Sequence, residues 1–551
     1  MHRPSAAVLS APWLFLSLLA AQAPAAPADT ALPAGAPAAM RTITRADLLR
    51  DATWLASDER GGRLTGSPGQ IAAAKYISDR FASLGLEPLG DVSEDGQARG
   101  FLQHYGIVRT YVDASTALQL GSLRLEQGFS ILGGKAMDEA IEGKLRFVGL
   151  GRTRGSQAEV GEDDSLDGTV AVAVIRPPRG NVERQLSVEQ KFAMSFRSFG
   201  QLGSTAKALE KKGAKAVLFL MIEDPMGLAD VLNYLAMSPG KASVAPRFAG
   251  ADGQMAMMSQ MFGGSGGAPT IVLSVPASER VLAELGVGKD AVLQFLAGDA
   301  ELPAAKADLQ AKGQLKIVRD DEATATNVVA VLRGSDPKLA EEALVYSAHM
   351  DHVGTRMDGE VFNGADDNAS GSAGLLAIAA AYAKSAEKPK RSIVFLSVSG
   401  EELGLWGSAF YADNPTWAAD KIVADINTDM IGRSGPESGP EQVTVTPSNR
   451  HAMFSTLVRD AAGLAEQLGL SFESGDKYYM RSDHYNFAKK GIPVVFFCNG
   501  EHEDYHQVSD TADKLDGAKM ERIARLAFWT GWNAANADER PSKLGKQDDW
   551  R

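Results

Sequence analysis

Histidines and carboxylates gather in one stretch of the 551-residue chain, between positions 349 and 506. Six of the eight histidines lie there, and acidic side chains recur directly after runs that read as buried β-strands. Histidine nitrogens and carboxylate oxygens are the donors that borderline cations such as Zn²⁺ accept. The candidate donors, in chain order, are His349, Asp367, Glu402, Asp429 and His506. A metal-dependent reaction is therefore predicted in this region.

The number of donors points to more than one ion. Five donors exceed what a single zinc ion usually takes from a protein. A carboxylate has two oxygens and can bridge, so five residues can hold two ions roughly 3.5–4 Å apart. Two further carboxylates, Asp351 and Glu401, lie within His349-Met350-Asp351-His352 and Gly400-Glu401-Glu402. Each motif alone is common on surfaces and in turns, so the prediction depends on all of them occurring in order after predicted strands.

The elements that must position these side chains alternate between strands and helices from about residue 315 to 537. Strands are predicted at 327–332, 343–348, 392–397, 422–427, 442–446 and 493–498. Helices are predicted at 42–57, 68–84, 372–384, 404–411, 450–468, 483–490 and 514–537. Several strands are continuous apolar runs, which is typical of strands covered on both faces. The predicted fold is α/β, an α/β/α sandwich with a mainly parallel central sheet, and such sheets place their sites at the carboxyl ends of strands.

These segments resemble the zinc exopeptidase family of aminopeptidase S, aminopeptidase Y and glutamate carboxypeptidase, in peptidase clan MH. The motifs that carry the resemblance are Ser347–Gly354, Asn363–Gly371, Ser399–Ser408, Asn427–Gly432 and Tyr505-His506. The match covers about residues 315–535 and a stretch at 60–88. It implies that Asp367 bridges two zinc ions, one of which His349 and Asp429 complete. Glu402 and His506 complete the other.

The same resemblance implies roles for three neighbouring residues. Glu401 resembles the general base that deprotonates the bridging water, and Asp351 resembles the carboxylate that holds His349. Tyr505 resembles a residue that hydrogen-bonds the developing oxyanion, with simple packing as the alternative. The scheme does not need His352, His484 or His502, and of these His484 lies in a stretch that the family places near its pocket.

The resemblance implies an exported di-zinc metallo-exopeptidase, which is a hydrolase that acts on peptides. Within this class an aminopeptidase is the leading hypothesis. Three alternatives stay open at this point: a carboxypeptidase of the same family, a glutaminyl cyclase with a single zinc, and a non-catalytic receptor-like ectodomain. The last is disfavoured because such relatives tend to lose ligands and this chain keeps all five.

The middle of the chain, about residues 125–300, has a different composition and no histidine. Strands at 144–149, 169–175, 216–221 and 269–275 and a helix at 204–212 predict a smaller inserted α/β domain. Its segment 213–219 resembles the protease-associated (PA) domain of many such exopeptidases, with an unrelated α/β insert as the alternative. The catalytic domain is then discontinuous, over 40–124 and 301–538, and 539–551 form a polar tail. Residues 242–267, rich in Gly and Met, are predicted as a loop that is either a flap over the cleft or surface filler.

The composition and the first 28 residues indicate which partners, cysteine chemistry and cellular location to expect. The 56 basic and 69 acidic residues give a net charge of −13, which opposes nucleic-acid binding. The single cysteine, Cys498, excludes an intrachain disulfide and a four-cysteine zinc site. Residues 1–28 have a basic start, a short apolar region and Ala-x-Ala triplets, which predicts a signal peptide rather than an uncleaved membrane anchor. A periplasmic or secreted bacterial protein without stable membrane insertion is expected.

Overall fold

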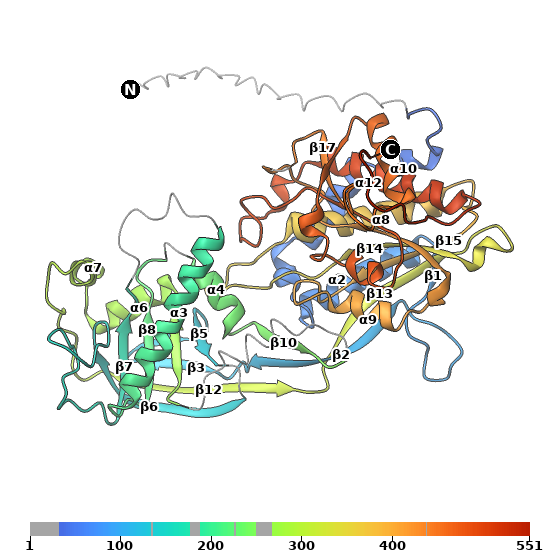
Figure 1. Ribbon diagram of the computed structural model, residues 1–551. Coiled ribbons are helices and arrows are strands. Elements are labelled where there is room, and N and C mark those ends of the chain that lie inside the picture. Colours follow the sequence, from blue (N-terminus) through green and yellow to red (C-terminus); the bar gives the residue numbers. More distant parts are fainter. Residues whose placement is uncertain are drawn as a thin grey trace, which may run out of the picture.

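The computed structural model describes residues 32–133, 136–176, 188–224, 227–248, 267–436 and 438–550. The predicted signal peptide and most of the predicted loop at 242–267 lie outside these ranges. The described chain forms two units, each with its own core (Figure 1). We call residues 32–106 and 324–550 the first unit and residues 107–320 the second unit. Among the described helices, none has the length and apolar character needed to cross a membrane.

The first unit contains a mixed β-sheet with a parallel centre. The central strands, in spatial order, are β15 (Ser392–Val398), β14 (Ala343–His349), β16 (Ile422–Thr428) and β19 (Val494–Cys498). On one side β13 (Thr324–Leu332) pairs antiparallel with β15, and β1 (Glu87–Pro88) pairs antiparallel with β13. On the other side β17 (Gln442–Thr446) pairs antiparallel with β19, followed by β18 (Ser471–Ser474). The predicted α/β fold is confirmed, with antiparallel borders around the parallel strands.

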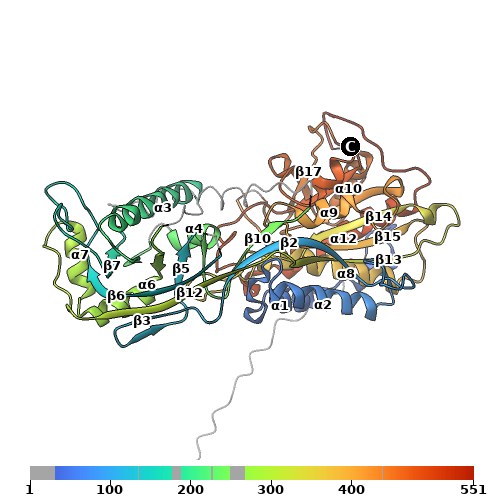
Figure 2. The same cartoon turned by 90° about the horizontal axis from the view of Figure 1, so that it is seen from below.

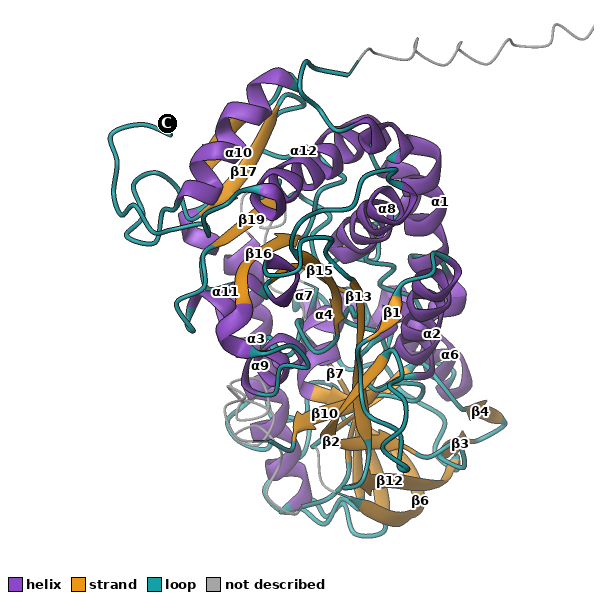
Figure 3. Ribbon diagram, turned by 90° about the vertical axis from the view of Figure 1, so that its right-hand side faces the viewer, coloured by secondary structure: helices purple, strands orange, loops and turns teal. Residues whose placement is uncertain are grey.

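Helices cover both faces of this sheet (Figure 3). One face carries α1 (Arg45–Leu55), α2 (Pro68–Ser83), α8 (Gly371–Lys384), α10 (Thr456–Gln467) and α12 (Gly517–Asn536). The other carries α9 (Trp406–Asp413) and α11 (His484–Ala488). Successive residues of a strand point to opposite faces. Leu344 and Tyr346 of β14 therefore pack under the first group of helices, and Val345 packs under the second group on the other face of the sheet. Burial on both faces explains the continuous apolar runs.

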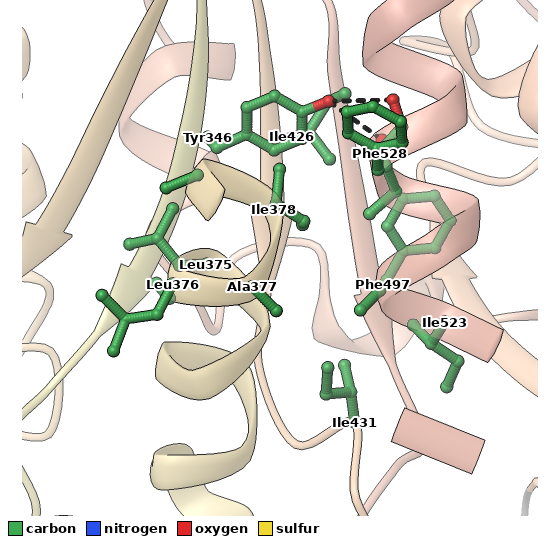
Figure 4. Packing of buried hydrophobic residues seen from close by; sticks show 14 of the residues in the cluster. Tyr346, Leu375, Leu376, Ala377, Ile378, Ile426, Ile431, Phe497, Ile523 and Phe528 are labelled. Carbon is green, nitrogen blue, oxygen red and sulfur yellow. Dashed lines mark hydrogen bonds between the residues drawn. The ribbon is translucent and has the colours of Figure 1, made fainter. Parts of the chain in front are cut away.

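The larger core fixes α8 and α12 against the sheet. Figure 4 shows Tyr346 of β14 beside Ile378 of α8 and Phe528 of α12. The buried Tyr346 hydroxyl donates to the main-chain carbonyls of Ala527 and Phe528, at 3.1 and 3.3 Å. Residues 539–550 also lie against this unit, because Trp550 packs edge-on against Phe472 with ring centroids 5.3 Å apart.

The second unit has a separate sheet with its own parallel strands. These are β6 (Met137–Phe147), β7 (Thr169–Val174), β8 (Ala216–Leu220) and β11 (Thr270–Leu273). Antiparallel strands extend the sheet on both sides: β5 (Phe129–Leu132), β9 (Ala236–Met237), β12 (Gln310–Asp320), β3 (Ala117–Leu120) and β4 (Leu123–Leu125). The described residues of this unit include the helices α3 (Val188–Glu210), α4 (Leu228–Leu235), α6 (Val275–Leu285) and α7 (Lys289–Ala297).

One strand, β2 (Leu102–Val112), belongs to both sheets. Residues 102–106 pair with β13, and residues 107–112 pair with β10 (Ala242–Pro246) and β12. The chain returns through β12 into β13, so long strands run from one unit to the other (Figure 2). The second sheet therefore includes strands on both sides of the predicted boundaries at 125 and 300. The first residues of the predicted loop at 242–267 are instead an edge strand, where Pro246 is tolerated.

Candidate metal centre

The candidate donors come from the carboxyl ends of the parallel strands in the first unit. His349 is the last residue of β14, Glu401 and Glu402 follow β15, and Asp429 follows β16. Asp367 lies in the turn 365–370 between β14 and α8, and His506 lies in the loop after β19. Parallel strands end at the same edge of a sheet. The structure thereby brings all five sequence-predicted donors into two adjoining clusters.

The first cluster surrounds the Nε2 atom of His349. Asp429 Oδ1 lies 3.3 Å from this nitrogen, Asp367 Oδ1 lies 3.4 Å from it, and Glu401 Oε2 lies 3.9 Å from it. His349 Nε2 and Asp429 Oδ1 are buried and have no hydrogen-bond partner in the described chain. Buried polar atoms normally have partners, so atoms left facing one another in this way fit a cation between them.

The second cluster shares Asp367 with the first. Asp367 Oδ2 lies 3.1 Å from His506 Nε2, and Glu402 Oε2 lies 2.9 Å from the same nitrogen. The two oxygens of Asp367 thus face different clusters, which is the arrangement of a bridging carboxylate. The nitrogen and oxygen donors of both clusters fit Zn²⁺.

His352 joins the second cluster, although the sequence analysis gave it no role. Its Nδ1 lies 2.6 Å from Glu402 Oε1 and 3.8 Å from Asp367 Oδ2, and its side chain is fully buried. The available signal was its position, three residues after His349 at a strand end. His502 and His484, in contrast, contribute no atom to either cluster within the described residues.

Asp351 lies behind His349. Its main-chain carbonyl is 3.3 Å from His349 Nδ1, and its Oδ1 is 3.7 Å from the same nitrogen. Oδ1 also accepts the main-chain N–H of Glu401 at 3.3 Å. Its Oδ2 accepts the Thr65 hydroxyl at 2.8 Å, and Thr65 in turn accepts the N–H of Gly400 at 2.9 Å. Asp351 is therefore held between the loop before α2 and the loop after β15, in a position to orient the His349 ring.

The turn that carries Asp367 is fixed from both sides. The Asp510 carboxylate accepts the main-chain N–H groups of Asp366 and Asp367 at 3.0 and 3.1 Å. The Asp366 carboxylate accepts the N–H of Gly432 at 2.6 Å and lies 3.2 Å from His502 Nε2. His502 thus contributes to the support of the bridging residue rather than to the clusters.

Arg63, in the turn before α2, ties three loops of the site together. Its guanidinium is fully buried and donates to main-chain carbonyls at 2.6 to 2.9 Å. The acceptors belong to Leu55, Met350, Asn363 and Gly364. Burial lowers the pKa of Arg63 to about 10, so it stays charged at neutral pH. Nothing in the sequence marks Arg63 as part of the site, because its partners are main-chain carbonyls and every residue type carries one.

Burial and neighbouring charges separate the two adjacent glutamates. Burial raises the pKa of Glu401 well above its ordinary value, and the nearby His349 offsets this only in part. Burial and Asp367 also raise the pKa of Glu402, but His506 and His352 outweigh them and lower it to about 2. Glu402 is therefore a permanent carboxylate, whereas Glu401 has the higher proton affinity that a proton acceptor needs.

A cleft opens beside the clusters. Asp367, Glu401 and Asp429 line its polar side. A largely apolar part of the lining is formed by Met430, Tyr478, Phe496, Cys498 and Tyr505, and the charged Arg481 and Glu501 also line the cleft. Tyr505 stacks on His506, with ring centroids 4.0 Å apart, and its hydroxyl accepts from Arg481 at 3.4 Å. His484 stacks on Phe496 behind the apolar part of the lining, with ring centroids 4.6 Å apart.

Comparison with known proteins finds a family model that matches the region of this site. Residues 327–530 match peptidase family M28. This match confirms the resemblance predicted from the motifs. That the second unit is a protease-associated domain stays a prediction.

Named relatives match about two fifths of this chain. A probable leucine aminopeptidase of Arthroderma otae is 28% identical over 217 residues, 38% of this chain and 58% of that protein. Leupeptin-inactivating enzyme 1 of Streptomyces exfoliatus is 31% identical over 230 residues, 41% of this chain and 48% of that protein. The chain thus spans about half to three fifths of the length of these curated relatives.

A solved structure extends the likeness in fold. BSAP, a zinc aminopeptidase from Bacillus subtilis, superposes with a TM-score of 0.51 at 18% identity. The superposition covers 90% of this chain and 96% of that chain. At this identity the likeness shows the fold alone.

Proposed function

We propose that this protein is a zinc aminopeptidase that removes N-terminal residues from peptides. The observation that carries the proposal is the pair of donor clusters joined by Asp367, with Glu401 and an open cleft beside them. The names of the relatives, a probable leucine aminopeptidase and a leupeptin-inactivating enzyme, support the same class of reaction. The apolar part of the cleft lining suits an apolar side chain on the substrate.

The donor set fits two zinc ions. His349 and Asp429 with Asp367 Oδ1 would hold one, and Glu402 and His506 with Asp367 Oδ2 would hold the other. When bound, zinc lowers the pKa of water and polarises the scissile carbonyl.

The residues of this chain then perform the proton transfers. Glu401 Oε2, which faces His349 in a buried site, accepts the proton of the attacking water and later passes it to the leaving amine. Asp351 keeps the His349 ring oriented. The Tyr505 hydroxyl borders the cleft and donates to the carbonyl oxygen as negative charge develops on it.

Two parts of the proposal concern the rest of the chain. Export to the periplasm or medium rests on the signal-peptide pattern of residues 1–28. For the second unit we propose the protease-associated role of limiting access to the cleft, without a part in the chemistry.

The test replaces each of the two adjacent glutamates by glutamine. Glu401→Gln keeps the shape but removes the proton acceptor, so zinc stays bound while turnover falls roughly 10²–10⁴-fold. Glu402→Gln removes a ligand, because a neutral amide binds zinc poorly, and excess Zn²⁺ restores part of the activity. Zinc content and hydrolysis of aminoacyl-p-nitroanilides measure both. Metal loss in Glu401→Gln together with two retained ions in Glu402→Gln would show that the roles are reversed.

A substrate panel separates the alternatives. An aminopeptidase cleaves peptides with a free N-terminus and spares N-acetylated ones. Release of C-terminal residues from N-acetylated peptides would instead indicate a carboxypeptidase. Cyclisation of N-terminal glutamine with one zinc per chain would indicate a glutaminyl cyclase, and zinc binding without any turnover would indicate a non-catalytic protein.

A further inference from the structure

The two clusters of the metal centre are unequal, and His352 makes the difference. Four residues with donor atoms within 4.8 Å of one another form the second cluster: His352, Asp367, Glu402 and His506. Around His349, in contrast, each group has three residues and a single imidazole: His349 with Asp367 and Asp429, and His349 with Glu401 and Glu402. The second position thus offers two imidazoles and two carboxylates, which is the number of donors that a closed zinc site uses.

Each of the two carboxylate oxygens of Glu402 lies close to a different imidazole ring. Oε2 lies 2.9 Å from His506 Nε2, and Oε1 lies 2.6 Å from His352 Nδ1. The two rings are nearly perpendicular, at 77°, with centroids 5.6 Å apart. His352 Nδ1 is also 3.8 Å from Asp367 Oδ2, so this nitrogen faces two carboxylates that belong to the cluster.

The His352 ring is held in this direction by its surroundings. Its main-chain N–H donates to the carbonyl of Arg63 at 3.3 Å, next to the loops that Arg63 ties together. On the other side the ring lies directly against Gly364, where a Cβ would approach Cγ and Cδ2 of His352 to 2.5 Å. The side chain is completely buried, and its Nε2 has no hydrogen-bond partner in the described chain. An imidazole so confined has little freedom to turn away from the cluster.

We propose that His352 Nδ1 is an additional ligand of the ion held by Glu402 and His506, so that this position binds zinc more tightly than the His349–Asp429 position. The inference rests on the proposed zinc centre. Binding is then sequential: a first equivalent of metal occupies the His352 side, and the second equivalent completes the site. A plainer role, in which His352 donates one hydrogen bond to Glu402 and orients it, is the competing explanation.

The substitution His352→Gln separates the two explanations. A glutamine amide can still donate a hydrogen bond to Glu402, but it is a poor zinc ligand. Loss of a partner that only orients a ligand costs 10–100-fold in metal affinity, and glutamine should recover much of that. If His352 is a ligand, affinity for the first ion falls by more than about 100-fold in His352→Gln and in His352→Ala alike.

The measurement is zinc retained after dialysis against graded chelator concentrations. His484→Gln is the control, because that histidine is also buried but contributes no atom to the clusters, so both ions should be retained as in the unchanged protein. Circular dichroism confirms folding of each variant. Near-normal retention of the first ion in His352→Gln would overturn the proposal.

A second measurement needs no variant. X-ray absorption of the unchanged protein, loaded with one equivalent of Zn²⁺, counts the imidazoles around the ion. Two imidazoles are expected, from His352 and His506, and a single imidazole would overturn the proposal. Failure of the proposed function would look different: the unchanged protein would bind no zinc, or would bind it without cleaving peptides.

Discussion

The two units both contain parallel strands, but in the described chain only the residues after the strands of the first unit come together as candidate metal-holding groups. In the first unit the strands end in or lead into His349, Glu401, Asp429 and His506. In the second unit β6 leads into Val148 and β8 into Met221 and Ile222, each almost completely buried. The candidate metal-holding groups of the described residues all lie in the first unit. Parallel strands provide an edge where a site can form, and the residues placed after them decide whether it does.

The difference extends into the interiors. The first unit buries charged groups such as Arg63, Asp351 and Asp366 in a connected hydrogen-bond network around the site. In the second unit the buried polar side chains of the described residues are uncharged, for example Ser130, Asn233 and Ser278. Buried polar groups are costly unless every one is satisfied. We therefore expect the first unit to be the more sensitive to single polar substitutions.

Arg63→Met tests this expectation where the effect should be largest. Four buried carbonyls lose their donor, and each unsatisfied buried group costs about 1–3 kcal/mol. The free energy of unfolding, measured by urea denaturation, should fall by at least about 3 kcal/mol, and zinc should be bound more weakly because the loops beside His352 and Asp367 lose their tie. Arg459→Met, at an exposed position on α10, should change stability by less than about 0.5 kcal/mol. Equal effects of the two variants would contradict the comparison.

Met357→Ala tests the contact between the units. Met357 lies in the segment 355–361 of the first unit, yet it is buried in the hydrophobic cluster of the second unit that also contains Leu228, Val231 and Leu232. Removing a buried methionine side chain costs about 2–5 kcal/mol. We expect the free energy of unfolding to fall by an amount in this range. The KM should change for peptide substrates but not for small aminoacyl anilides, and the zinc content should stay the same. Met480→Ala, where the side chain is 64% exposed, is the matched control and should leave all three unchanged.

Asp230→Asn tests the rim of the same contact and should have the smallest effect. Asp230 of α4 lies 3.4 Å from Arg356, and both are partly exposed. Burial raises the pKa of Asp230 above 3.8, and Arg356 only partly offsets this. Asp230 therefore holds its proton more tightly in the folded state than in the unfolded state. As the pH rises above 3.8, ionisation of this side chain lowers the free energy of unfolding.

The asparagine variant should therefore be equal to or slightly more stable than the unchanged protein at pH 7, by less than about 1 kcal/mol. Arg356 keeps a second partner in Asp358, at 3.0 Å. The difference should vanish below pH 3.8, where Asp230 is protonated in both states. Thermal unfolding across pH measures it, and a clear loss of stability at pH 7 would show that the ion pair holds the units together.

What the sequence could reveal depended on local signals. The five donors were found because each follows an apolar run or lies in a Gly-flanked acidic turn, both of which are legible in sequence. His352 was missed because its direction is set by contact with Gly364, twelve residues away, and by the loop that holds Arg63. Met357 reads as one apolar residue in a polar loop, and its partners lie more than a hundred residues earlier. Such contacts depend on tertiary packing that no periodicity records.

The elements show the same pattern. Strands buried on both faces, such as β14 and β15, were predicted within a residue or two. β18 was missed because Ser471-Phe472-Glu473-Ser474 is polar and mostly exposed at the sheet edge. The N-terminal part of α3 was missed as well, since only its last turns have a clear apolar period. Elements at the edge are stabilised by contacts with their neighbours, so their own sequences show only a weak hydrophobic pattern.

The strand shared by both sheets limits how the second unit can move. A domain joined by flexible linkers can swing on them at little energetic cost, but here β2 is hydrogen-bonded along its length, first to β13 and then to β10 and β12. Any swing of the second unit over the cleft must bend this ribbon of paired strands or break its ladder. A motion of the second unit relative to the first would therefore be an elastic bending of paired strands that returns to its resting shape, rather than the free opening and closing of a hinge.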